Sequence, residues 1–215
     1  SQLGRPSTLF NSSKNSNFIY EITNINLTEN NIKKINAIST RSKIYDRIRA
    51  IINFKGKLNF IKTEGSVFNN NLKLIDSSMP LILSRLIVLF NSTSHKRLTD
   101  LIRVLSQENP LGFDMTNNHS FYEYKLKRLL NDIALGMTAA KVWNGLFDAS
   151  GGYLVVKEDG DLLCYHIYNR NQFDNYLINN TQLLNPSTTK MNFGKIYKEN
   201  GKLLIKLNLQ IRFLK

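Results

Sequence analysis

The sequence contains a single cysteine, Cys164, in 215 residues. A disulfide framework requires pairs of cysteines, and a cysteine-clustered zinc site requires several, so both classes are excluded. A chain with so little cysteine is typical of a reducing compartment, and we predict a cytoplasmic protein.

Long apolar segments and flexible linkers are also lacking. The longest apolar run, Leu81 to Phe90, is interrupted by Ser84 and Arg85 and is too short for a membrane span. The first residues, SQLGRPSTLF, have neither the basic start nor the apolar stretch of a signal peptide. No internal repeat and no long Pro, Gly or Ser linker divides the chain, so we predict a single unit over residues 1–215.

Acidic residues are scarce relative to basic ones. Asp and Glu total 16 against 29 Lys and Arg, which gives a formal net charge of +13. With 42% hydrophobic and 21% charged residues, the chain is expected to fold. The excess of cations favours a polyanionic partner, either nucleic acid or an anionic membrane surface. The membrane is the weaker alternative, because no basic amphipathic helix carries bulky aromatic residues.

The hydrophobic pattern predicts an α+β (mixed α/β) fold. Apolar residues at three- and four-residue spacing predict helices over Thr28–Ile35, Ser42–Asn53, Ser66–Ser77, Met79–Asn91, Leu98–Gln107, Ser120–Leu135 and Asn171–Asn179. Strands are predicted over 17–22 and 57–62, with hairpins around Asp159-Gly160 and Asn200-Gly201. Residues 1–16 and 185–194 are predicted to be loops.

Two helices carry predictions about which side chains face inward. In Ser42–Asn53 the pattern assigns Ile44, Tyr45, Ile48, Ile51 and Ile52 to one helical face, and several of the basic residues in this quarter of the chain, which include Arg47, fall on the polar face. In Ser120–Leu135 the inward positions include Tyr124 and Leu129.

One short pattern matches a catalytic motif by spelling. Asp114 followed by Glu123-Tyr124-Lys125 has the acidic residue and ExK of metal-dependent nucleases, which hold a metal between carboxylates on adjacent strands. Here ExK lies in a predicted helix, where side chains two residues apart diverge. We therefore interpret it as a solvated helix face, and the three histidines show no ligand spacing either. No metal site is predicted within these residues.

The loop after the last predicted helix combines hydroxyl groups with a cation. Ser187, Thr188 and Thr189 precede Lys190, a combination that suits phosphate oxygens.

The longest signal is a resemblance to a known family. The segment SQLGRPSTLFNSSKNSNFIYEI and the stretches GGYLVVKEDGDLLCYHIYNRNQFDNYL, STTKMNFGKIY and LNLQIRF closely resemble the HpaII-like type II restriction endonucleases. The resemblance extends over residues 1–213 and is strongest in 1–22 and 151–213. It implies a PD-(D/E)xK nuclease of a restriction-modification system that hydrolyses duplex DNA at C-C-G-G with Mg²⁺.

The resemblance also implies where the catalytic residues lie. In the family SQLG directly follows a strand that ends in the active-site lysine, with the metal-binding aspartate further upstream. We therefore expect a C-terminal portion that is inactive alone, with the Mg²⁺ ligands before Ser1 and with Ser1 and Gln2 at the edge of the active site. The upstream strands are expected to pair with residues 17–22. Residues 1–64 would be the rest of the nuclease core, 65–150 a helical region and 151–215 a hairpin-rich region.

The expected DNA-binding residues come from the segments with the best resemblance and from the basic positions. They are Arg5, Lys14, Arg170, Ser187, Thr188, Lys190 and Arg212. Arginines can read guanine O6 and N7 with two parallel hydrogen bonds, which suits Arg5, Arg170 and Arg212. The implied partners are double-stranded DNA, a second copy in a homodimer, and a methyltransferase that shares the target site. The charge alone equally supports a non-catalytic DNA- or RNA-binding module, and this alternative stays open.

Overall fold

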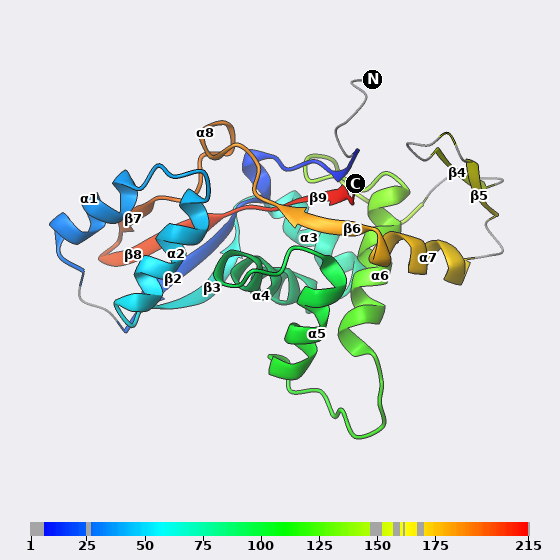
Figure 1. The fold of residues 1–215 in the computed structure, drawn as a ribbon, viewed down its shortest axis with the longest axis horizontal. Coiled ribbons are helices and arrows are strands. Elements are labelled where there is room, and N and C mark those ends of the chain that lie inside the picture. The colour runs from blue at the N-terminus through cyan, green and yellow to red at the C-terminus, as the bar shows by residue number, and fades with distance from the viewer. Residues whose placement is uncertain are drawn as a thin grey trace.

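The computed structural model describes residues 7–24, 27–146, 152–156, 160, 162–166 and 170–214. Within them, antiparallel strands form two larger sheets and a hairpin, and helices cover the sheets (Figure 1). The fold is therefore mixed α+β, as the hydrophobic pattern predicts.

The larger sheet has four strands in the order β3-β2-β8-β7. Its strands are β2 (Phe18–Thr23), β3 (Lys57–Thr63), β7 (Ile196–Glu199) and β8 (Lys202–Leu207). The turn between β7 and β8 places Asn200 at φ 49° and Gly201 at φ 75°, the left-handed pair that a two-residue hairpin turn requires. The predicted Asn200-Gly201 hairpin is confirmed.

A smaller sheet has the order β1-β9-β6, from β1 (Thr8–Phe10), β9 (Gln210–Phe213) and β6 (Thr181–Leu184). The two sheets meet where β8 passes into β9 (Figure 1). Asn208, fully buried at this junction, donates hydrogen bonds to the Ser13 carbonyl (3.0 Å) and to Asn17 Oδ1 (2.6 Å). These bonds attach the first described segment to the last one.

The helices match the predicted periodicity. They are α1 (Glu29–Ala37), α2 (Lys43–Asn53), α3 (Ser66–Ile75), α4 (Met79–Ser92), α5 (Leu98–Glu108), α6 (Phe121–Ala134), α7 (Arg170–Asn179) and α8 (Thr188–Met191), with a 3₁₀ turn η1 (Lys14–Ser16). Apolar nearly all round, α4 lies in the core, and the buried Tyr20 of β2 donates a hydrogen bond to the Ser84 carbonyl of α4 (2.7 Å). The paired strands β4 (Gly152–Val156) and β5 (Leu162–His166) form the predicted first hairpin.

Several sequence-based predictions about local structure are wrong. The predicted loops contain β1, η1 and α8, and β6 was not predicted. β9 does not extend the second hairpin but crosses to the smaller sheet, where it lies between β1 and β6. β2 is hydrogen-bonded to β3 on one side and, over residues 18–21, to β8 on the other, so these residues offer no free edge to a further strand. The expected pairing of upstream strands with this segment is therefore corrected.

In the described part of the chain, no helix combines the length and apolar character that crossing a bilayer requires.

Candidate nucleic-acid interface

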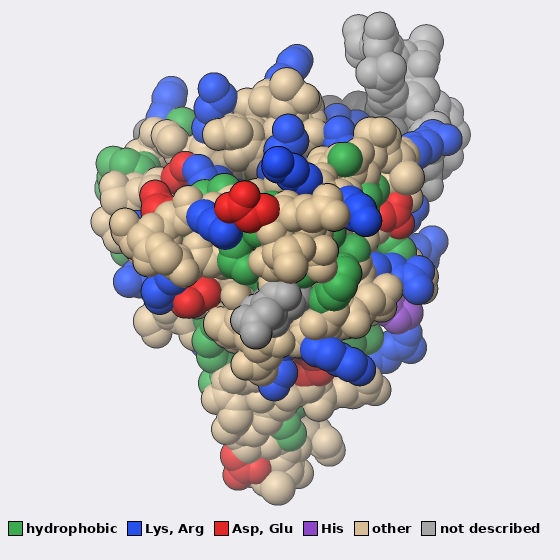
Figure 2. All heavy atoms as spheres, turned by 90° about the vertical axis from the view of Figure 1, so that its left-hand side faces the viewer, with side chains coloured by type: hydrophobic (Ala, Val, Ile, Leu, Met, Phe, Trp, Pro, Cys, Tyr) green, Lys and Arg blue, Asp and Glu red, His purple; other side chains and the backbone are tan. Residues whose placement is uncertain are grey.

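A basic pocket of about 510 Å³ lies where α2 meets the chain between α8 and β8. We call it the basic pocket, and its lining residues are Lys43, Arg47, Thr188, Thr189, Asn192, Phe193, Lys195, Tyr197 and Lys206. Figure 2 looks onto the end of the molecule formed by α1, α2, β7 and β8, where Lys and Arg side chains are spread widely and acidic ones are few. Polar and cationic side chains thus dominate the lining of the pocket.

Arg47 is the buried cation of this pocket. Only 5% of the residue is exposed, and its guanidinium donates to three backbone carbonyls: Gly194 (2.6 Å), Asn36 (2.9 Å) and Ile38 (2.6 Å). Its Nε is buried without a hydrogen-bond partner. Burial lowers the pKa of Arg47 from its ordinary value, and the guanidinium stays charged at neutral pH. Among the described residues, no carboxylate forms an ion pair with it, so its positive charge acts on the pocket.

The connection from Asn192 to Lys195 is held from both sides. The Gly194 carbonyl accepts the Arg47 hydrogen bond, and the Gly194 amide donates to the Lys206 carbonyl (2.8 Å). Gly194 has φ +85°, and a Cβ added there would lie 2.2 Å from Ile44 Cδ1. Another residue here would be strained by the positive φ, and the terminal methyl group of Ile44 would have to shift to make room for its Cβ. The backbone held at Gly194 determines where the next residue, Lys195, begins.

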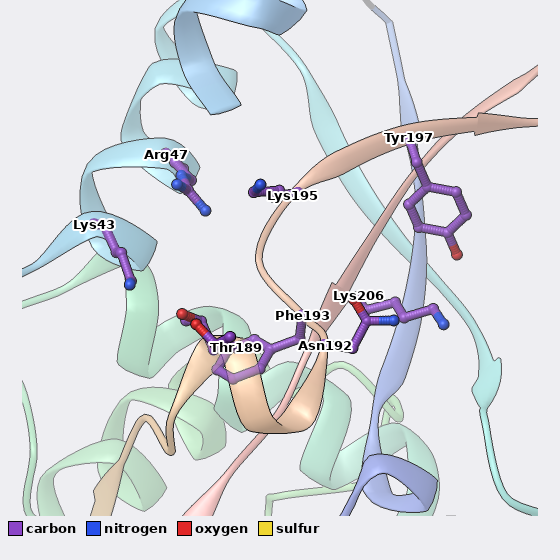
Figure 3. A pocket seen from close by; sticks show the side chains of 9 residues that line it. Lys43, Arg47, Thr189, Asn192, Phe193, Lys195, Tyr197 and Lys206 are labelled. Atoms are coloured by element: carbon purple, nitrogen blue, oxygen red, sulfur yellow. The ribbon is translucent and has the colours of Figure 1, made fainter. Parts of the chain in front are cut away.

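The remaining cations differ in how they are neutralised. Lys206 forms an ion pair with Glu64. For Lys43 and the exposed Lys195, the structure shows no acidic partner in the residues that it describes. Figure 3 shows the side chains of Lys43 and Arg47 from α2 and of Lys195 directed toward the same space, with Thr189 next to it. Three positive charges therefore surround one space.

Tyr197 adds a hydrogen-bond donor on the other side of the connection (Figure 3). Burial, followed by the negative charges of Glu199 and Glu64, raises the pKa of Tyr197. The phenol therefore stays protonated at neutral pH. The Lys206 ammonium lies 5.8 Å from the centre of the tyrosine ring, within the range of a cation–π contact.

The structure brings part of the predicted hydroxyl-rich loop to the basic pocket. Thr188 lines the pocket, together with Thr189. Ser187 instead caps α8, since its Oγ accepts a hydrogen bond from the Lys190 amide (3.4 Å). Lys190 is exposed and does not line the pocket.

The other predicted DNA-binding residues lie elsewhere. Lys14 begins η1 and is exposed, and Arg170 begins α7. Arg212 lies on the central strand of the smaller sheet, opposite Gln182, and its Nε is buried without a partner. Ser1, Gln2 and Arg5 fall outside the described residues. Of the positions whose side chains the structure describes, Lys14 and Arg212 do not line the basic pocket.

The ExK motif, Glu123-Tyr124-Lys125, lies on helix α6, as predicted. Glu123 forms an ion pair with Lys127 one turn later on α6 (2.6 Å), and Lys125 forms one with Asp76. Asp114 accepts hydrogen bonds from the amide and hydroxyl groups of Thr116. No group of three or more His, Cys, Asp and Glu side chains that could hold a metal occurs among the residues the structure describes. These residues thus do not provide the carboxylate set that a nuclease Mg²⁺ site needs, and we derive no step through this ion.

The sequence pattern did not identify the buried role of Arg47, and it misplaced two side chains, one on α2 and one on α6. Ile44, Arg47, Ile48 and Ile51 are buried with the spacing of one helix face, whereas Ile52 is 44% exposed. The signal in the sequence is the position of Arg47, which lies three residues after Ile44 and one before Ile48 and therefore falls within the buried face of the helix. On α6, Tyr124 is 61% exposed rather than inward.

Comparisons with known proteins identify the family of the chain. The family model of the HpaII restriction endonuclease matches residues 1–213. The type II restriction enzyme HpaII of Haemophilus parainfluenzae is 49% identical over 214 residues, a match that covers 100% of this chain and 58% of that enzyme. No solved structure shows significant similarity. The chain belongs to the HpaII restriction endonuclease family.

Proposed function

We propose that the protein is a type II site-specific deoxyribonuclease that hydrolyses duplex DNA at C-C-G-G and requires Mg²⁺. The observation that carries this proposal is the family match over residues 1–213, together with 49% identity to a restriction enzyme. The net charge of +13 agrees with a polyanionic substrate. A methyltransferase that modifies the same site is the partner that such an enzyme requires, and we propose a homodimer as its assembly.

We propose that the metal ligands and the catalytic lysine of a PD-(D/E)xK core lie in the part of the protein that these 215 residues do not cover. Two observations support this. The chain spans 58% of the related enzyme's length, and the described residues contain no cluster of metal-ligating side chains. Ser1 and Gln2 would then lie at the edge of the active site. In this assignment the described residues bind and orient DNA, and they do not perform the hydrolysis.

Two kinds of DNA contact are proposed for this chain. Cationic and hydroxyl side chains, among them Lys14, Ser187, Thr188 and Lys190, contact the sugar-phosphate backbone, which fixes the register of the protein on the duplex. Arg5, Arg170 and Arg212 are the candidates for reading guanine in the major groove.

The salt dependence of duplex binding tests the backbone contacts. Each phosphate neutralised by Lys or Arg contributes about −0.9 to the slope of log affinity against log salt concentration. Several contacts predict a steep decline between low and moderate salt, measured with a fluorescent duplex and no added Mg²⁺. An affinity that does not change with salt would refute phosphate binding.

Alanine variants of the three arginines test base recognition in the complete enzyme. Loss of one bidentate contact should reduce discrimination between C-C-G-G and a changed site by about 1–3 kcal/mol. If Arg5→Ala, Arg170→Ala and Arg212→Ala all retain full discrimination, the assignment of the base-reading residues is wrong. A complete protein that binds DNA or RNA but never cleaves would favour the non-catalytic binding module instead.

A further inference from the structure

We propose that the basic pocket binds one phosphate group of the DNA backbone, with Lys43 and Lys195 as its cationic ligands and Arg47 as the positioning residue. This inference rests on the proposed function, since it specifies where the duplex contacts this chain. It concerns residues that the sequence alone did not assign to DNA binding.

Arg47 carries a positive charge that no described carboxylate neutralises. Arg47 is 95% removed from solvent, and its guanidinium is satisfied by carbonyl oxygens, which are dipoles rather than negative charges. A cation placed in a medium of lower dielectric than water exerts a stronger field than an exposed one. An anion that enters the pocket next to Arg47 would therefore gain more than it would at an exposed lysine.

A buried donor without an acceptor adds to this. Arg47 Nε is buried and lacks a hydrogen-bond partner, and Arg47 lines the pocket. Buried donors in folded proteins are nearly always paired, so an unpaired one in the wall of a pocket calls for an explanation. An anion held by Lys43 and Lys195 would compensate the positive charge of this guanidinium.

The backbone that carries Lys43 and Lys195 is already held in place before a ligand binds. The Arg47 and Lys206 hydrogen bonds to Gly194 fix the backbone next to Lys195, and α2 fixes Lys43 and Arg47 one turn apart. Lysines held on two rigid elements can close on a phosphate with little loss of backbone freedom. Thr189, next to the same space in Figure 3, adds a hydroxyl donor of the kind that contacts phosphate oxygens.

The pocket also differs from a site for an apolar ligand. Phe193 is its main apolar residue, and this side chain is itself 5% exposed and packed in the core. A ligand in the pocket therefore meets ammonium, guanidinium, amide and hydroxyl groups. Among anionic groups, the phosphodiester is the one that the proposed substrate supplies.

The test compares duplex binding by the complete enzyme and its variants without added Mg²⁺, so that the DNA is not cleaved. The variants are Lys43→Ala, Lys195→Ala and the double variant. Lys73→Ala is the matched control, because Lys73 is an exposed lysine on α3 that does not line the pocket. The control removes the same charge without touching the proposed site.

We expect the double variant to bind roughly ten- to a hundredfold more weakly than Lys73→Ala at low salt, the range of a charged hydrogen-bonded contact. Its salt slope should be smaller by about 0.9 for each protomer bound, because the two lysines of one protomer contact one phosphate rather than two. A set of duplexes that each carry one neutral methylphosphonate identifies this phosphate. The unmodified enzyme should lose affinity at one position in each half-site, and the double variant should be insensitive at that position.

Three outcomes would overturn the inference. The first is a double variant that matches Lys73→Ala in affinity and slope. The second is a double variant that remains sensitive to every methylphosphonate. The third is a thermal shift with inorganic phosphate that depends on Lys43 and Lys195 while DNA binding does not, which would assign the pocket to a free anion. Cleavage of C-C-G-G by the unmodified enzyme is measured separately. If that enzyme cleaves, the proposed function stands whichever of these outcomes is found. If it does not cleave, the proposed function itself is refuted.

Discussion

Replacing Gly194 by alanine should destabilise the protein more than the same change at Gly201. Both glycines have positive φ, +85° and +75°, so an alanine at either position is strained by about 1–2 kcal/mol. At Gly201 nothing lies within 4 Å of the added Cβ, and the strain is the whole native-state cost. At Gly194 the Cβ would lie 2.2 Å from Ile44 Cδ1, so the terminal methyl group of Ile44 must also shift.

The additional cost at Gly194 follows from the packing of Ile44. This side chain is 3% exposed, and forcing an extra carbon against it should cost about 1–3 kcal/mol more, as overpacking of a closed core does. We therefore expect Gly194→Ala to lower the free energy of unfolding by about 2–5 kcal/mol, and Gly201→Ala by about 1–2 kcal/mol. Urea denaturation followed by circular dichroism measures both.

A second substitution tests the contact between residue 194 and Ile44 alone. Ile44→Val removes Cδ1, the clashing atom, and should cost about 0.5–1.5 kcal/mol alone. Combined with Gly194→Ala, it should restore stability relative to the sum of the two single changes, because the atoms that collide are no longer both present. Equal costs at Gly194 and Gly201, with no rescue by Ile44→Val, would refute the packing of this connection against α2.

Two further predictions concern the helical part of the chain. Tyr122→Phe should cost about 1–3 kcal/mol in thermal unfolding, because the buried hydroxyl accepts a hydrogen bond from the Leu111 amide (3.0 Å); an unchanged midpoint would contradict this. Burial opposes ionisation of Asp76, but hydrogen bonds from Lys125 and Ser78 outweigh it and lower its pKa. Its contribution to stability is therefore present above about pH 4 and lost as the pH falls through the folded-state pKa. The difference in the free energy of unfolding between the unmodified protein and Asp76→Asn should therefore decrease as the pH falls through that range. A difference that does not change with pH would refute this role of Asp76.

The elements that the sequence predicted are those whose cause is local. The helix over 66–75 repeats apolar residues on one face, and Thr28 accepts the hydrogen bond of the Asn31 amide as an N-cap should. The Asn200-Gly201 turn likewise needs only its own two residues to adopt positive φ.

The strands that were missed depend on distant partners. β6 has four residues and pairs with β9, about 30 positions away, and the three residues of β1 also pair with β9. Such short segments have no periodicity to detect, and hydrogen bonds to a partner strand define them. The central position of β2 between β3 and β8 is also a property of the whole sheet.

The basic pocket could not be found from spacing, because it joins two segments that lie far apart in the sequence. Arg47 reaches the Gly194 carbonyl across a separation of 147 residues. An arginine within an apolar stripe indicates burial, but the carbonyls that satisfy it come from other elements. For the same reason, helical periodicity assigned Tyr124 to the core, although none of the described elements covers it and it is 61% exposed.

The proposed function assigns cleavage at C-C-G-G to the complete protein, and DNA binding rather than the metal-dependent step to these residues. The decisive measurement incubates the 215-residue chain and a version extended upstream with Mg²⁺ and a plasmid that contains C-C-G-G sites. We expect discrete cleavage at those sites by the extended protein and none by the 215 residues. Site-specific cleavage by the 215-residue chain that is abolished by Glu123→Ala would overturn this assignment.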